Sequence, residues 1–358
     1  ITMDKNEIIT MLSATPSPKQ IAQWLRTQYF PEIVSRFNHE SSRKRFGLYQ
    51  NEQLPANERN LTDVRTRMGV LIEFELARIS NDLLPEIGIT DIFWSYVVAN
   101  RFPDLEVRRN SGERLLRLEI KCLQCIAEEK SANFDTLMKD IDPRTDYVVV
   151  CLWDWNNASS STYAWDSVPQ IYKIYIFHAY SLTALRDAYW LNKPPANIGD
   201  GYQGFDARYA VTCSNGHYSK EQGNYGKLTR IWKKGFAYRP AETEELLDTE
   251  NEYLSFQKEI IATGFEILSK SHLRQLTNDT IEEIVENGNI IGYKANRFAY
   301  VQSNVRQILS FAQSHNATII VTMTEKYRSN VYKIGATTVD KIADNEKPKR
   351  LLSIISQL

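Results

Sequence analysis

Two carboxylates and a lysine lie close together in one short segment of the sequence, FPDLEVRRNSGERLLRLEIKCL, residues 102–123. The carboxylates belong to Asp104 and Glu119, and Lys121 follows two residues after Glu119. Carboxylate oxygens are ligands that Mg²⁺ prefers, and this ion keeps several water molecules beside one or two protein carboxylates. A bound metal neutralises charge on a phosphate and lowers the pKa of its water, which a lysine can orient or deprotonate. The segment therefore suits hydrolysis of a phosphodiester bond.

Two strand-like runs, LEVRR and LLRLEIKCL, must position these residues, and a turn-prone Asn-Ser-Gly separates them. Successive side chains of a strand point to opposite faces, so Leu118 and Ile120 share one face while Glu119 and Lys121 share the other. If the turn folds the two runs into a hairpin, Asp104 joins Glu119 and Lys121 at one end of the charged face. The pattern predicts that Leu118 and Ile120 are buried and that the charged pair faces a cleft.

These residues resemble the motif of the PD-(D/E)XK nuclease superfamily, to which most type II restriction endonucleases belong. Pro103-Asp104 is similar to the first half of that motif, and Glu119-Ile120-Lys121 is similar to the second. The surrounding order of helix, strand, turn, strand, helix and buried strand is also similar, over roughly residues 61–155. A second Glu-x-Lys, Glu128-Glu129-Lys130, lies in a polar stretch without strand alternation and does not share this setting.

In this family a glutamate on the preceding helix often supports the metal site. The helix expected over residues 62–84 contains MGVLIEFELARI, which offers Glu73 and Glu75 on a largely apolar surface. An unpaired carboxylate on such a surface is costly, so a functional role for one of them is expected. Glu73 is preferred because it stacks along the helix with Gly69 and Ala77, whose small side chains allow close approach.

The resemblance implies an α/β fold with a restriction-endonuclease-like mixed sheet of about five strands, flanked by helices and extended by helical N- and C-terminal additions. It also implies a Mg²⁺-dependent type II restriction endonuclease that cuts double-stranded DNA at a short specific sequence and acts as a homodimer. Asp104 and Glu119 would ligate the metal, and Lys121 would position the attacking water. Glu73 would support the metal from the helix.

Other interpretations of the same residues stay open. Within the nuclease class, the alternative is a repair or recombination nuclease that reads DNA structure. From a different class, the alternative is a non-catalytic DNA-binding regulator that keeps the fold. A salt-bridged surface hairpin would account for the charged residues 104–121 without any chemistry.

A second informative segment is HYSKEQGNYGKLTRIWKKGFAYRP, residues 217–240, in which six basic residues and one acid alternate with aromatic residues. Lysine and arginine bind phosphates without regard to sequence, whereas asparagine and arginine can read base edges in the major groove. The residues predicted to contact DNA are Asn224, Tyr225, Lys227, Arg230, Lys233 and Lys234. The alternative is that the aromatic residues belong to a core and the lysines are merely solvated.

Composition sets the limits of these interpretations. The 358 residues include 43 Lys plus Arg and 44 Asp plus Glu, for a net charge of −1, with 42% apolar and 24% charged residues. These proportions are typical of globular proteins and exclude a disordered or fibrous chain. The charge balance excludes a uniformly basic nucleic-acid coat, so any DNA contact must be a local patch.

Cysteines and apolar runs exclude further classes of protein. Cys122 and Cys125 form a lone CxxC and the five histidines are scattered, so the thiols are expected to be small buried side chains rather than zinc ligands. The first residues are acidic and do not resemble a signal peptide. The longest apolar run, Tyr147 to Trp153, is far shorter than the roughly 20 residues of a membrane helix. A cytoplasmic protein without a membrane partner is expected.

Three regions follow from the pattern along the chain. Residues 1–60 are expected to be a helical region, with Ser17-Pro18 starting one helix. Residues 61–240 are expected to be the nuclease core with DNA-contacting insertions. The acidic run AETEELLDTENEY marks a shift near residue 241, so residues 241–358 are expected to be an α+β subdomain. Its predicted elements are helices over 250–270 and 302–314 and the strands ATIIVTM and NVYKIG, and no internal repeat is detected.

Overall fold

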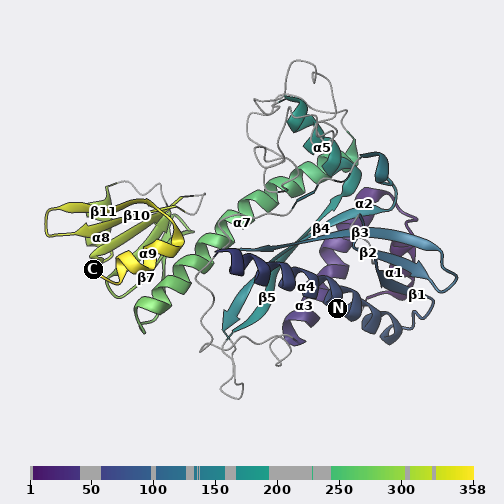
Figure 1. Cartoon of the computed structure of the whole chain (residues 1–358), viewed down its shortest axis with the longest axis horizontal. Helices are drawn as coiled ribbons and strands as arrows, with labels where there is room; N and C mark the ends of the chain where they lie inside the picture. Colours follow the sequence, from purple (N-terminus) through teal and green to yellow (C-terminus); the bar gives the residue numbers. More distant parts are fainter. Residues whose placement is uncertain are drawn as a thin grey trace. The chain divides into compact units, whose positions relative to one another are not determined.

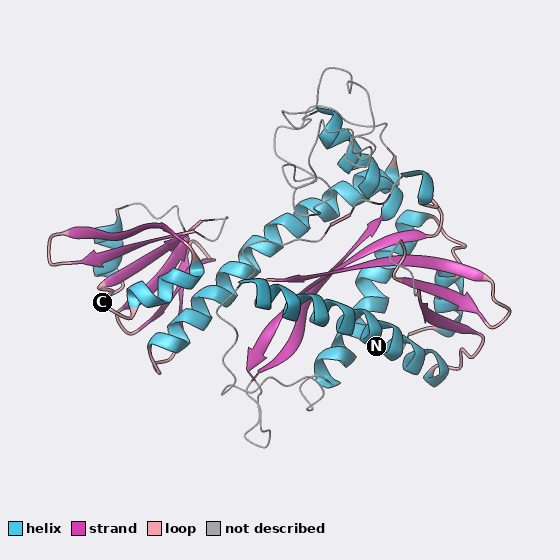
Figure 2. Cartoon of the chain, viewed as in Figure 1, coloured by secondary structure: helices cyan, strands magenta, loops and turns pink. Residues whose placement is uncertain are grey.

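A computed structural model describes residues 3–40, 58–97, 102–125, 133–134, 136, 138–157, 167–192, 228, 243–302, 307–324 and 328–358. The fold is mixed α/β, with one five-stranded and one six-stranded sheet (Figures 1 and 2). The chain divides into two compact units, the first built mainly from residues up to Gln257 and the second mainly from Lys258 to Leu358. Within the described ranges, no helix is long and apolar enough to cross a membrane.

The sheet of the first unit contains the predicted hairpin. Its strands lie in sequence order, namely β1 (Ile92–Tyr96), β2 (Leu105–Arg109), β3 (Arg114–Gln124), β4 (Asp146–Asn157) and β5 (Ser167–His178). Neighbouring strands are antiparallel except β3 and β4, which are parallel. Gly112 closes the β2–β3 turn with a φ of +90°, a conformation that favours glycine, and its N–H donates to the Arg109 carbonyl at 2.8 Å.

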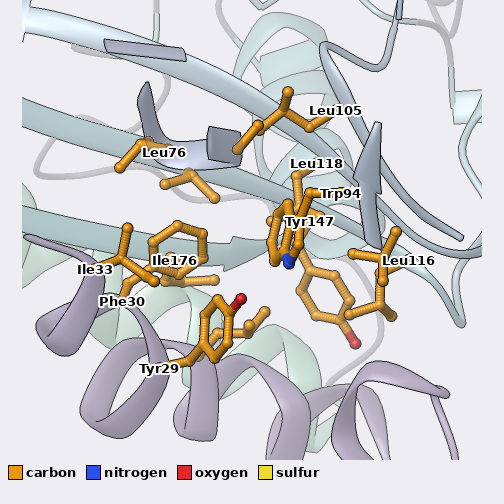
Figure 3. Close-up of a cluster of buried hydrophobic side chains, with 14 of the residues drawn as sticks. Tyr29, Phe30, Ile33, Leu76, Trp94, Leu105, Leu116, Leu118, Tyr147 and Ile176 are labelled. Carbon is orange, nitrogen blue, oxygen red and sulfur yellow. The ribbon is translucent and has the colours of Figure 1, made fainter. Parts of the chain in front are cut away.

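The apolar face of this hairpin lies in the core of the first unit. Leu105 of β2 is opposite Leu118 of β3, and both are fully buried, as is Ile120. Figure 3 shows Leu105 and Leu118 in a cluster that includes Tyr29 and Phe30 from the N-terminal helices. The predicted burial of Leu118 and Ile120 is therefore confirmed, and the alternation of side chains places Glu119 and Lys121 on the other face.

Helices from the N-terminal region and one long helix cover the apolar face. They are α1 (Lys5–Leu12), α2 (Pro18–Trp24), the π-helix η1 (Leu25–Tyr29), α3 (Phe30–Glu40) and α4 (Glu58–Glu86). Ser17 caps α2 as predicted, in a reciprocal pair of hydrogen bonds with Gln20. The predicted helix over residues 62–84 is confirmed by α4, which contacts β1 and β3.

Gly69 of α4 packs against β3. A Cβ atom at Gly69 would lie 3.7 Å from the Cβ of Cys122, which is ordinary van der Waals contact. We therefore expect Gly69→Ala to be tolerated or to stabilise the protein by up to about 1 kcal/mol, because alanine favours helices more than glycine does. Gly69→Leu should instead destabilise it by about 1–3 kcal/mol through overpacking. Urea unfolding of both variants checks this, and equal stability of the two would contradict the contact.

The opposite face of the sheet is covered by α5 (Ala179–Asn192) and by the first half of α7 (Glu244–Leu276). Phe177 of β5 packs its ring against those of Tyr253 and Phe256, with centroid distances of 6.1 and 6.0 Å. Glu244 and Glu245 lie in the first turn of α7, where negative charge favours the helix dipole. The acidic run near residue 241 thus coincides with the start of a long helix.

The second unit contains a six-stranded sheet and two short helices. Its elements are β6 (Glu282–Glu286), β7 (Asn289–Ala295), β8 (Phe298–Gln302), α8 (Ile308–Ser314), β9 (Ile319–Met323), β10 (Ser329–Ile334), β11 (Val339–Glu346) and α9 (Pro348–Ile355). The second half of α7 and α9 cover one face, and α8 covers the other. The predicted strands ATIIVTM and NVYKIG correspond to β9 and β10, but the helix predicted over 302–314 is restricted to α8.

The prediction of a helical C-terminal addition is wrong, because the C-terminal region is built mainly on a six-stranded sheet. Strands β6, β7, β8 and β11 were missed because short hairpin strands carry little apolar periodicity. A signal was nevertheless present at Asn287-Gly288, where both residues have positive φ angles in the turn between β6 and β7. Asn-Gly between two short runs is the strongest local indication of a hairpin.

The two sheets share one pattern of strand pairing. In each, a long helix precedes three antiparallel strands, the third strand pairs in parallel with the fourth, and the fifth is antiparallel to the fourth. The helix α4 and the strand β3 of the first unit thus correspond in order to α7 and β8 of the second. This repeat of architecture is absent from the sequence, in which no internal repeat is detected.

Candidate active site

Asp104 is held at the start of β2 by the hairpin itself. Its carboxylate oxygen Oδ2 accepts the N–H of Ile120 at 2.7 Å, and its own N–H donates to the Leu118 carbonyl at 3.1 Å. Extending the Leu105–Leu118 pairing by one residue places Asp104 opposite Glu119. The predicted approach of these two carboxylates follows from the register of the strands.

Lys121 and Glu119 form an ion pair on the charged face of β3. The Nζ of Lys121 lies 2.6 Å from Oε1 of Glu119, and Glu119 is only 8% exposed. Burial lowers the pKa of Lys121, but the carboxylates of Glu119 and Asp104 outweigh it and hold the pKa above its usual value. The lysine is therefore an ammonium ion in this arrangement, which suits it to orienting a water molecule or a phosphate oxygen.

Glu73 of α4 is directed toward the same carboxylates, whereas Glu75 is not. Burial and the charge of Asp104 raise the pKa of Glu73 to about 7, although Lys121 and a hydrogen bond from Tyr96 lower it. Glu75 instead pairs with Arg78, whose Nη2 lies 2.9 Å from Oε2 of Glu75. Of the two glutamates that the sequence offered, the docking of α4 brings Glu73 to the hairpin.

Among the described residues, the charges of this cluster do not balance. Three carboxylates, from Asp104, Glu119 and Glu73, surround the single ammonium of Lys121, and burial also raises the pKa of Asp104. A divalent cation would relieve this repulsion. In the described part of the chain, no three His, Cys, Asp or Glu side chains are close enough to hold a metal ion together. Asp104 and Glu119 nevertheless fit Mg²⁺, which needs only one or two carboxylates beside its waters.

Three cysteines of the described residues lie in or next to β3 and β4. Cys125 and Cys151 are fully buried, and Cys122 is partly buried beside Gly69. A hydrogen bond with Cys151 and burial raise the pKa of Cys122 well above its usual value, so its thiol stays protonated. The prediction of small buried thiols near strands is confirmed for these three cysteines.

The DNA-contact residues predicted from sequence, Asn224, Tyr225, Lys227, Arg230, Lys233 and Lys234, lie outside the described residues. The same holds for the second Glu-x-Lys at Glu128-Glu129-Lys130. Within the 217–240 segment the structure describes Leu228, which is fully buried and whose carbonyl accepts a hydrogen bond from the Tyr253 hydroxyl. At this one position the segment packs against α7.

Sequence reasoning missed Tyr96 as part of the cluster. Tyr96 ends β1, a strand that was not predicted, and its hydroxyl lies near enough to Glu73 to lower the pKa of that carboxyl. Its ring also stacks on that of Phe74, with centroids 4.1 Å apart and an interplanar angle of 13°. The run DIFWSYVV, rich in aromatic and β-branched residues, was the available signal for this strand.

The second sheet provides an internal comparison. Its strand β8, which corresponds in order to β3, reads FAYVQ and contains no Asp, Glu or Lys. Ala299 and Val301 point to the face opposite α7 and are fully buried beneath α8. The carboxylate–lysine cluster is therefore not a by-product of this strand arrangement but a property of the first sheet.

Comparisons of the chain with protein-family models, with curated proteins and with solved structures find no match.

The raised pKa of Glu73 predicts a pH-dependent loss of stability in metal-free protein. Its pKa rises from about 4.5 in the unfolded chain to about 7 on folding, so Glu73 favours the folded state below pH 4.5 and ceases to do so as the pH rises through 7. Glu73→Gln should therefore be more stable than wild type at pH 8 by about 1–2 kcal/mol, allowing for solvent screening, with the difference vanishing below about pH 4. Urea unfolding of both proteins in EDTA across this pH range measures the difference in stability. Parallel profiles of stability against pH for the two proteins would contradict the raised pKa.

Proposed function

We propose that this chain is a Mg²⁺-dependent type II restriction endonuclease that hydrolyses phosphodiester bonds of double-stranded DNA at a short specific sequence. The observation that carries the proposal is the cluster on the β2–β3 hairpin, where the strand register places Asp104 opposite Glu119, Lys121 pairs with Glu119, and Glu73 of α4 lies within electrostatic range of all three. Several carboxylates beside one lysine are costly for stability, whereas a metal-dependent hydrolase requires such carboxylates to bind its metal ion. A restriction-endonuclease-like fold is part of the same proposal.

Each side chain of the cluster has a different proposed role in the reaction. Asp104 and Glu119 would hold the magnesium ion, and Glu73 would support it from the helix. The bound ion would supply charge neutralisation at the phosphate and a water of lowered pKa. Lys121, kept protonated by its carboxylate neighbours, would orient the attacking water and hold a phosphate oxygen. The backbone hydrogen bond from Ile120 keeps Asp104 in place.

Substrate binding and assembly complete the proposal. The basic, aromatic segment 217–240 would supply contacts to phosphates and bases. Each chain carries one such cluster within its described residues, so two chains are proposed to act together as a homodimer, one on each strand of a symmetric site.

A digest of phage DNA separates the possible functions. The purified chain is incubated with the DNA and Mg²⁺, with EDTA and with Glu119→Gln as parallel controls. Discrete bands that require both the metal and Glu119 support restriction. Cutting confined to branched DNA supports a repair nuclease, and DNA binding without any cutting supports a regulator.

A further inference from the structure

An exposed stripe on α4 borders the carboxylate cluster. Arg67, Val70 and Phe74 lie at helical spacings of three and four residues and therefore on one side of the helix. Val70 is 41% exposed and Phe74 is 50% exposed, which is unusual for apolar side chains on a helix that docks on a sheet. Arg67 is exposed as well and forms no ion pair with any described side chain. The stripe thus offers a cation and an aromatic ring to solvent on the same side.

Tyr96, which lies beside the carboxylate cluster, holds the ring of Phe74 in place. One of its faces stacks on Tyr96, with centroids 4.1 Å apart, and the hydroxyl of Tyr96 lies near Glu73, the neighbour of Phe74 in sequence. Tyr96 is also one residue from Val97, whose N–H donates to the Asp104 carbonyl at 2.9 Å. The aromatic pair is therefore fixed to the same hairpin that carries the carboxylates. With one face of Phe74 covered, its exposure belongs largely to the other face.

We propose that the open face of Phe74 stacks on a nucleobase that is turned out of the duplex next to the phosphate held at the carboxylate cluster. The proposal rests on the proposed nuclease function and adds how the substrate is recognised beside the site. Phe74 and Tyr96 already form a stack, to which a base can add a third ring. Stacking does not depend on the base sequence, because every base has a π-face. The helix rises about 10 Å from Arg67 to Phe74, which spans about three nucleotides of one strand. Arg67 then meets a phosphate on the same strand.

A second copy of the chain fits this stripe less well than DNA does. A protein contact would favour Val70 and Phe74 but would also have to place a carboxylate against the guanidinium of Arg67, because a buried and unpaired charge is costly. DNA supplies a phosphate for Arg67 and, where a base leaves the duplex stack, an open π-face for Phe74. The stripe also lies beside the cluster, so DNA that reaches the carboxylates passes over it.

Fluorescence anisotropy with labelled duplex and single-stranded oligonucleotides tests the stacking in the full chain, with EDTA present to prevent cleavage. Phe74→Ala and Phe74→Leu should weaken binding about 5- to 100-fold, whereas Phe74→Trp should retain it, because the ring and not its apolar bulk makes the contact. Arg67→Gln should lower the slope of log K against log salt by about one. Tyr180→Ala, which truncates a 38% exposed aromatic residue on α5, is the matched control and should bind as wild type does.

Oligonucleotides in which 2-aminopurine replaces adenine at successive positions provide the direct readout. Quenching at one position by wild type and Phe74→Trp, lost in Phe74→Leu, supports the stacking. Wild-type affinity and quenching in Phe74→Leu would overturn it while leaving the nuclease proposal intact. A wild-type protein that binds no DNA would overturn the nuclease function itself. Sedimentation velocity adds a separate check, since dissociation of a dimer by Phe74→Ala would show that the ring contacts a second chain instead.

Discussion

Lys121→Ala is expected to reduce the rate of DNA cleavage by about 100- to 10,000-fold, which is the usual contribution of one positioned proton-transfer or charge-stabilising group. Lys121 is the one ammonium among three carboxylates, and its Nζ lies 2.6 Å from Glu119. Its removal leaves the attacking water without an orienting partner and the carboxylates without their counter-charge. Cleavage rates of folded protein under single-turnover conditions measure the loss.

Asp104→Asn and Glu119→Gln should lose cleavage to a similar extent while binding DNA as tightly as wild type or more tightly. Both replacements remove a metal ligand, but each also removes a negative charge that repels phosphates in the absence of metal. Filter binding in EDTA beside the cleavage assay separates the two effects. Weaker binding by both variants would indicate a collapsed hairpin rather than a lost ligand.

Two variants serve as matched controls for these three. Glu106→Gln alters a buried carboxylate on the same hairpin that pairs with Arg108, and it should remain active. Lys130→Ala alters the second Glu-x-Lys and should remain active as well. Cleavage at the wild-type rate by Lys121→Ala, or loss of activity in both controls, would show that the assignment of the site is wrong.

Asp146→Ala is expected to destabilise the fold by about 3–5 kcal/mol, the cost of leaving one partner of a buried ion pair alone. Asp146 is 0% exposed at the start of β4, next to β3. Its carboxylate accepts the Nε–H of Arg117 at 2.7 Å and the backbone N–H of Asp142 at 2.7 Å. Without the aspartate, the Arg117 guanidinium loses this carboxylate partner on the charged face of β3.

Urea unfolding at neutral pH measures this change, with Asp140→Ala as the control because its exposed side chain lies in the adjoining short helix η3 (Met138–Asp140). Asp140→Ala should change the stability by less than about 0.5 kcal/mol, as expected for a surface substitution. A loss in Asp146→Ala no larger than that of the control would mean that Arg117 finds another partner.

Local features of the sequence were sufficient to predict the hairpin and its two faces. The alternation of side chains in β3 and the turn before it depend on backbone geometry within a few residues. Both can therefore be predicted without knowledge of any tertiary contact. The same holds for α4, for the cap at Ser17 and for the buried β4, whose apolar run is continuous. The gathering of Asp104, Glu119 and Lys121 followed from these local rules.

Tertiary structure alone decided which helix residue joins them. Glu73 and Glu75 are equivalent in the sequence pattern, and the rotation of α4 about its axis, set by its packing on the sheet at Gly69 and Cys122, directs Glu73 to the hairpin. Tyr96, Phe74 and four of the six strands of the second sheet escaped prediction for the same reason. Their positions depend on pairings between segments distant in the chain, whereas periodicity and turn chemistry report only on neighbours, so long-range packing had to supply the rest.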